Sequence, residues 1–165
     1  MLADEQYCIC AYTDTFLGPS DDAHIEHFNP ELKGKPEDSY TNWFLVKSLW
    51  NIRKLTKWTD YQPLLHPTAD DLEQRILYID GDYVLADNDD LPAKNLMRLL
   101  DLDNAQLADQ RKRYVKSKKE EIADSRKSGQ TFFDDLLVRY REGVYFIRAI
   151  ETEFNVKVNF DLLRT

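Results

Sequence analysis

The 165-residue sequence predicts an α+β fold, with a small site-bearing α/β region followed by a β-hairpin and helices. Three observations predict this class. Short apolar runs bounded by turn residues near the N-terminus are typical of strands. Asp80-Gly81-Asp82 lies between two further apolar runs, a typical hairpin pattern. From Asn104 onward apolar residues recur at helical spacing, which indicates amphipathic helices.

The N-terminal elements follow from this pattern in order. Residues 6–13 alternate weakly and are rich in Cys, Ile and Tyr, so we expect a short strand. Residues 17–22 form a turn cluster, and residues 24–28 a second strand that ends at Asn29-Pro30. Residues 31–39 are predicted to be a polar loop. Thr41 then caps an expected helix whose apolar positions are Phe44, Leu45, Leu49 and Trp50.

The later elements carry stronger local signals. Residues 76–79 and 83–86 are the arms of the predicted hairpin, since Gly81 tolerates a positive φ at the turn. Residues 88–90 with Pro92 predict a helix start. A helix from Asn104 is expected to break at residues 128–130, after which Thr131 caps the next. One apolar stripe then comprises Leu136, Leu137, Tyr140, Val144, Ile147 and Phe154, before a short strand or extended tail with Val156, Val158 and Phe160.

Composition bounds the function classes. A chain that is 42% hydrophobic and 32% charged, with five Gly, is typical of a folded globular protein. Cys8 and Cys10 are too close in sequence to bridge each other on a strand, which favours a reducing compartment. Neither a signal peptide at residues 1–6 nor an apolar run of ~20 residues is evident, so we expect a cytoplasmic location and no membrane contact. The net charge of −8 disfavours a stand-alone, high-affinity DNA binder.

The segment His24-Ile25-Glu26-His27-Phe28-Asn29-Pro30, followed by Asn42 and Asn51, contains the most informative candidates. A carboxylate and an amide oxygen are hard ligands suited to Mg²⁺. An imidazole beside them can take a proton from water near neutral pH. Two other interpretations remain open from the residues alone. His24 and His27 are ordinary polar loop residues, or they belong to a zinc site, although zinc usually needs about four N or S ligands.

Glu26-His27-Phe28-Asn29-Pro30 resembles the Asp/Glu-His-x-x-Pro core of HNH (ββα-metal) nucleases. Asn51-Ile52-Arg53-Lys54 resembles their Asn-x-x-Lys segment, and Asn42 lies where their middle Asn falls. Further segments between residues 2 and 111 are similar to the HNH nucleases of bacterial anti-phage systems of the Septu and retron-associated types. The resemblance implies a ββα-metal core over residues 1–60. Residues 61–165 are then a hairpin and helical extension that packs on this core as one unit.

The resemblance also implies a role for each matching residue. His27 is the expected general base, and Asn42 bridges the loop of the ββα unit by hydrogen bonds and orients His27. Glu26 and Asn51 are expected to hold one Mg²⁺ or Mn²⁺ ion. Three basic residues are expected to contact nucleic-acid phosphates, unless they form a solvated helix face: Arg53, Lys54 and Lys57.

The family usually braces this core with zinc held by two Cys-x-x-Cys pairs, of which only Cys10 remains here, so we expect no structural zinc. The implied activity is a metal-dependent endonuclease that cleaves DNA in preference to RNA. It would be the effector of a defence complex with an ABC-type or SMC-like ATPase. The alternatives are a catalytically inactive, HNH-derived interaction subunit and an RNase effector that acts on tRNA.

A dense basic segment, with six Lys or Arg in residues 111–119, is predicted to be mainly a solvated helix face. Contact with phosphates and contact with an acidic partner surface are the alternatives for it.

Overall fold

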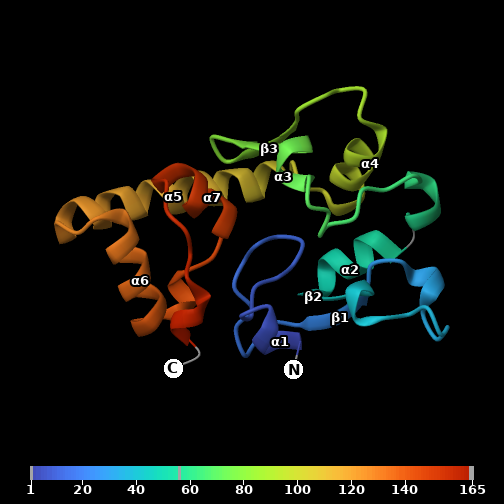
Figure 1. The fold of residues 1–165 in the computed structure, drawn as a ribbon, viewed down its shortest axis with the longest axis horizontal. Coiled ribbons are helices and arrows are strands. Elements are labelled where there is room, and N and C mark those ends of the chain that lie inside the picture. The colour runs from blue at the N-terminus through green and yellow to red at the C-terminus, as the bar shows by residue number, and fades with distance from the viewer. Residues whose placement is uncertain (1, 56, 164–165) are drawn as a thin grey trace.

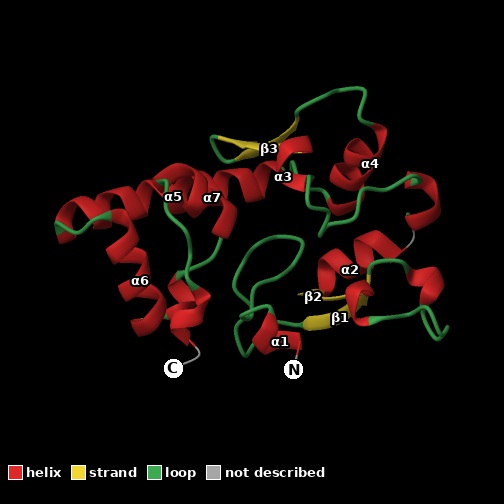
Figure 2. Ribbon diagram, viewed as in Figure 1, coloured by secondary structure: helices red, strands yellow, loops and turns green. Residues whose placement is uncertain are grey.

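The computed structural model describes residues 2–55 and 57–163 and has an α+β architecture (Figures 1 and 2). Two separate two-stranded antiparallel sheets are combined with helices of four to 21 residues. Along the described chain the strands and α-helices are α1 (Leu2–Glu5), β1 (Ala23–His27), β2 (Trp43–Lys47), α2 (Ser48–Leu55), α3 (Leu72–Arg75), β3 (Ile76–Ile79), β4 (Asp82–Leu85), α4 (Leu91–Leu100), α5 (Ala105–Ser125), α6 (Gly129–Arg139) and α7 (Ile147–Phe154).

The first sheet and the helix after it form a ββα unit. Strands β1 and β2 pair antiparallel, so that Glu26 lies opposite Phe44 and His27 opposite Trp43. Helix α2 begins directly after β2, at Ser48, and packs against both strands. The backbone N–H of Ser48 donates to the carbonyl of Asp22 (2.8 Å), which ties the start of the helix to the start of β1. This arrangement turns one face of α2 toward β1.

Two expectations for this region were wrong. Residues 6–13 do not form a strand, because the chain leaves α1 through positive φ angles at Tyr7 and Cys8 and keeps only an isolated bridge from Ile9 to Phe16. The helix expected from Thr41 is strand β2 over its first part, since residues 43–47 pair with β1 and alternate in burial. Helix α2 starts only at Ser48. A short apolar run is compatible with either structure, and pairing with a distant strand decides between them.

One hydrophobic core joins the ββα unit to the segment after it. Phe28, Phe44 and Trp50 pack with Trp58, and helix α4 covers the same cluster. The buried members come from both sides of residue 60 and are Cys10, Tyr12, Leu17, Phe28, Phe44, Val46, Trp50, Trp58, Leu65, Ile76, Ala93, Leu96, Met97, Leu99, Leu100 and Leu107. Residues 61–107 therefore complete the core of the preceding segment.

The predicted hairpin is confirmed. Strands β3 and β4 pair antiparallel with Ile79 opposite Asp82, so the second arm begins one residue earlier than expected, and the turn has a positive φ at Gly81 (86°). A Cβ at Gly81 would lie 3.0 Å from the carbonyl oxygen of Ala108 and closer still to the Lys112 side chain. The turn therefore packs directly on α5, where only glycine leaves enough room.

The helix starts at α4 and α5 are also confirmed. The Asp90 side chain accepts from the N–H of Ala93, and the Asn104 side chain accepts from the N–H groups of Gln106 and Leu107. Both are N-caps, which satisfy backbone donors that the first helical turn leaves free.

The C-terminal stripe is split between two helices rather than carried by one. Ser128, not Thr131, caps α6, which ends at Arg139. Helix α7 begins after Phe146, which has a left-handed backbone conformation. Residues 156–158 belong to no helix or strand, so the tail does not form the short strand that was one of the two expectations. A second core lies between these helices, α5 and the hairpin, formed by Tyr78, Tyr114, Val115, Phe133, Leu137, Val144, Phe146, Ala149 and Ile150.

Loop residues 8–16 contact both the ββα unit and the start of helix α7. The N–H of Phe146 donates to the carbonyl of Asp14 (2.6 Å), and the N–H of Arg148 donates to the Asp14 carboxylate (3.3 Å). Asp14 therefore satisfies backbone donors at the start of α7, which is far from Asp14 in the sequence. Within the described residues, no helix is both long enough and apolar enough to pass through a membrane.

Candidate functional site

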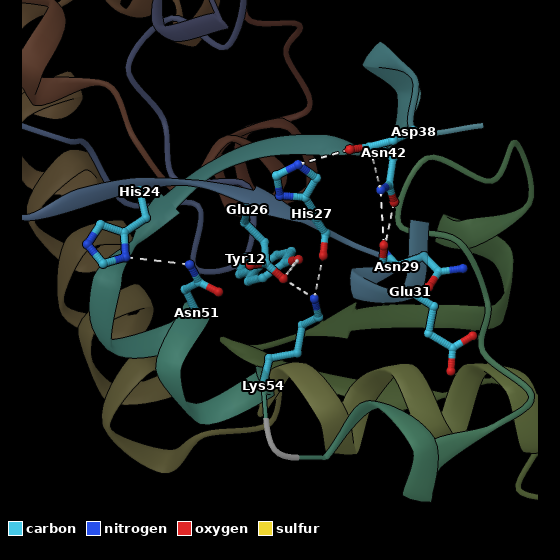
Figure 3. A network of polar contacts seen from close by, with 10 residues as sticks. All are labelled: Tyr12, His24, Glu26, His27, Asn29, Glu31, Asp38, Asn42, Asn51 and Lys54. Atoms are coloured by element: carbon cyan, nitrogen blue, oxygen red, sulfur yellow. Dashed lines mark hydrogen bonds and ion pairs between the residues drawn. The ribbon is translucent and has the colours of Figure 1, made fainter. Parts of the chain in front are cut away.

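The ββα unit places the predicted site residues in three contact groups, drawn in Figure 3. Glu26 contacts Lys54 and Tyr12, His24 contacts Asn51, and Asn42 lies with His27 around Asp38. The first two groups lie between β1 and α2. His24 and Glu26 are two residues apart on a strand and share a face, while Asn51 and Lys54 are three apart on a helix and also share one.

Glu26 is buried and already bears a cationic partner. Its Oε1 accepts from the Lys54 ammonium and, at 3.4 Å, from the Tyr12 hydroxyl. Only 3% of Glu26 is exposed, and Lys54 is fully buried. Burial lowers the pKa of Lys54 to about 7 and raises the pKa of Tyr12. In its protonated form, Lys54 is the counter-ion of the buried Glu26 carboxylate.

Asn51 lies on the same face of α2 but contacts a different residue of β1. Its amide nitrogen lies 3.5 Å from Nδ1 of His24, whose Nε2 is in turn 3.5 Å from a carboxylate oxygen of Asp22. No hydrogen bond joins Asn51 to Glu26 in the described chain. The two expected metal ligands therefore face the same side without direct contact.

Asn42 bridges the two ends of the loop between β1 and β2. Its Oδ1 accepts from the N–H of Asn29 (2.7 Å), and its Nδ2 donates to the carbonyl of Asn29 (3.1 Å) and to Asp38 (3.0 Å). The neighbouring backbone bond, from the N–H of Phe28 to the carbonyl of Asn42 (2.8 Å), closes the same loop. Asn42 is 5% exposed, so these bonds are shielded from water.

Asp38 was not among the residues expected in the site. Its Oδ2 lies 3.1 Å from Nε2 of His27, and its Oδ1 accepts from Asn42 and from the indole N–H of Trp43 (2.9 Å). The Asn42 hydrogen bond and then the Trp43 bond hold the pKa of Asp38 below its usual range. An ionised carboxylate beside Nε2 favours the tautomer protonated there, which leaves the Nδ1 lone pair as the proton acceptor.

His27 itself is partly open to solvent. Its side chain is 21% exposed, and its ring makes an edge contact with Trp43 at 6.2 Å between centroids. It follows Glu26 directly at the end of β1 and belongs to a different contact group. The His27 imidazole is therefore accessible to water, whereas the neighbouring Glu26 carboxylate is buried.

The three expected phosphate-binding residues differ in accessibility. Arg53 is about half exposed, lies 3.4 Å from an Asp101 carboxylate oxygen and stacks over Trp50. Lys57 is exposed. Lys54 is buried against Glu26, so a phosphate contact by its ammonium requires this ion pair to open. Sequence reasoning missed that burial because its partner lies 28 residues away.

Half of the basic residues in the α5 segment form ion pairs within the molecule. Arg111 is 2% exposed and donates to the carbonyls of Gly81 and Leu102. Three lysines form ion pairs: Lys112 with Asp82, Lys118 with Glu121 and Lys119 with Glu153. Arg113 and Lys116 remain exposed.

The donor chemistry of Glu26 and Asn51 suits a hard divalent cation, and the Lys54 ammonium already occupies a cation position on the carboxylate. In the described residues, three or more His, Cys, Asp or Glu side chains do not converge as a ready-made metal centre. Cys10 is buried, and its sulfur accepts from the N–H of Lys47 (3.4 Å).

A groove of about 660 Å³ runs between loop residues 9–14, β2 and the start of α7. Glu26, His27, Asn42 and Asn51 do not line it, so we do not assign the candidate chemistry to this groove. Comparison with protein-family models, curated proteins and solved structures finds no match to this chain.

Proposed function

We propose that this chain is a metal-dependent endonuclease of the HNH type, in which residues 23–55 are the ββα-metal core. The observation that carries the proposal is the Asn42 bridge. A buried Asn closes the loop after His27 through three hydrogen bonds and, through Asp38, holds the imidazole. This is the positioning role that the sequence resemblance implies for that residue.

The residues divide the work as follows. Glu26 and Asn51 would hold a Mg²⁺ or Mn²⁺ ion, which when bound supplies charge stabilisation at the scissile phosphate. His27 takes a proton from the attacking water at Nδ1, because Asp38 keeps the proton on Nε2. Asn42 and Trp43 fix Asp38, so that the imidazole is held before substrate arrives. Arg53 and Lys57 are accessible for backbone phosphates.

DNA is the substrate we propose. RNA, including tRNA, is kept as the alternative, because this set of residues acts on the phosphodiester and contains no element that reads the sugar. The resemblance to anti-phage nucleases further supports an effector role beside an ABC-type or SMC-like ATPase. The acidic net charge of −8 is compatible with a partner that captures the substrate.

One observation favours a second function. The carboxylate expected to bind metal is buried and neutralised by Lys54, an arrangement that a catalytically inactive, HNH-derived interaction subunit would also tolerate. The two functions differ in what His27 does.

The test is cleavage of supercoiled plasmid with Mg²⁺ or Mn²⁺, comparing the parent chain with His27→Ala. A general base contributes about 10²–10⁴-fold, so the variant should lose cleavage by that factor while its melting temperature changes little. His66→Ala is the matched control, because His66 bonds Thr68 and packs on Phe28 and Phe44, which are not among the proposed site residues. Equal cleavage by His27→Ala and the parent would reject the nuclease in favour of the interaction subunit.

A further inference from the structure

The environment of Lys54 is that of a bound cation. It lies in the last turn of α2, and its ammonium donates to the Glu26 carboxylate and to the backbone carbonyl of His27 (2.9 Å). The faces of Phe28 and Trp58 lie 5.7 and 5.4 Å from the same nitrogen. Figure 3 shows the side chain extending from the helix to a point between Glu26 and the His27 carbonyl. Oxygen acceptors and aromatic faces thus enclose a single positive charge.

That position conflicts with divalent metal on the same carboxylate. Lysine is rarely buried completely unless it is paired, and here its partner is the residue proposed to hold the ion. A divalent ion on Glu26 would sit close to the ammonium in a poorly hydrated site, where like charges repel strongly. Oε1 of Glu26 already holds the ammonium, and a divalent ion bound to the same buried carboxylate would lie within a few ångströms of it, so metal binding favours the departure of Lys54.

Once it leaves Glu26, the Lys54 side chain can contact solvent or a phosphate. Arg53 and Lys57, its neighbours along the chain, are exposed and lie where phosphate contacts are proposed. A lysine side chain can turn outward about its own torsions, and its ammonium then regains water or gains a phosphate. The same residue thereby changes from a partner of Glu26 to a partner of substrate.

We propose that Lys54 is an internal competing cation that keeps the Glu26 site closed until a divalent ion displaces its ammonium. This inference rests on the proposed metal-binding role of Glu26 and adds its regulation. The apparent metal affinity of the resting chain is the affinity of the open form multiplied by the small fraction of molecules in which Lys54 has swung out. Nucleic-acid phosphates favour that open form, so substrate and metal bind cooperatively.

The test is Mn²⁺ binding without nucleic acid, followed by the electron paramagnetic resonance signal of free Mn²⁺. Lys54→Met removes the charge and keeps most of the side-chain volume, so we expect its dissociation constant to fall about tenfold or more relative to the parent. Lys116→Met is the matched control and should bind like the parent, because Lys116 is exposed on α5 and is not part of the proposed site. Glu26→Gln placed in the Lys54→Met chain should abolish the gain, which locates the ion on Glu26.

A second measurement uses the unmodified chain and does not depend on whether Lys54→Met folds. Amine acetylation read by mass spectrometry should leave buried Lys54 unlabelled without metal and label it when Mn²⁺ is present. Lys57 should be labelled in both conditions. Equal Mn²⁺ affinity in Lys54→Met and the parent, or protection of Lys54 at saturating Mn²⁺, overturns the exchange.

The two proposals fail in different ways. Cleavage that needs His27 while Lys54 stays protected retains the nuclease and overturns the exchange. If Lys54→Met binds Mn²⁺ more tightly but the parent chain shows no plasmid cleavage, the exchange is retained and the nuclease proposal is overturned.

Discussion

Replacing Asn42 with alanine tests the bridge on which the proposed function depends. The change removes the partners of two backbone groups, the N–H and the carbonyl of Asn29, which Asn42 holds at 2.7 and 3.1 Å. A net contribution of about 1 kcal/mol for each bond gives a loss of about 2 kcal/mol in the free energy of unfolding. For a chain of 165 residues this corresponds to a fall of about 4–8 °C in melting temperature. Circular dichroism melts and urea titrations measure both quantities.

The control is Asn29→Ala, the same substitution at the other end of the bridge. The Asn29 side chain accepts from the N–H of Glu31 on the surface (3.0 Å), and the backbone groups that Asn42 contacts are kept. We expect a loss of about 0.5 kcal/mol, small for a cap of a single turn. Asn42→Ala should also slow plasmid cleavage, because Asp38 loses the Nδ2 donor and His27 loses its fixed orientation. Equal destabilisation by the two variants would refute the bridge as the support of this loop.

Two further predictions concern stability. Arg111→Ala should lower the free energy of unfolding by about 3 kcal/mol or more in urea titrations, since it removes the donor to the buried Gly81 carbonyl and to the partly buried Leu102 carbonyl. Lys116→Ala on the exposed face should change it by no more than about 0.5 kcal/mol, and similar values for both variants would contradict an anchoring role. Burial raises the pKa of Asp14 to about 7 from an ordinary 3.8, so the folded state retains a proton between those values that the unfolded state has lost. Stability should therefore fall as pH rises from about 4 to about 7, by about 2–4 kcal/mol from this group, and Asp14→Asn should remove that part of the decline in pH-dependent urea titrations. An unchanged pH profile in Asp14→Asn would reject the assignment.

Local signals in the sequence predicted those parts of the fold that a few adjacent residues determine. The Gly81 turn needs a residue that tolerates positive φ, and the starts of α4 and α5 need side chains that accept backbone N–H groups. Strand β2 was misassigned because residues 43–47 satisfy either periodicity over so short a run, and β1 is what makes them a strand.

The candidate site divides in the same way. The sequence pattern picked out Glu26, His27 and Asn42, since acid, base and amide are recognisable by type and order. It did not indicate that Asp38 contacts His27 or that Lys54 is buried, because each contact depends on how the loop and α2 fold back onto β1. A carboxylate or lysine that ends in such a contact looks like any other surface residue in sequence.

The distribution of charge bears on how a site of this kind meets its substrate. Several basic residues near the site and on α5 form ion pairs with neighbouring acids. The pairs are Lys54 with Glu26, Arg53 with Asp101, Lys112 with Asp82 and Lys119 with Glu153. Phosphate affinity depends on cations that are free to release counterions, and an overall charge of −8 repels a polyanion at long range. We therefore propose that another subunit brings nucleic acid to this chain. A site that Lys54 holds closed until substrate and metal arrive together suits an effector of that kind, because it limits cleavage by the unassembled chain.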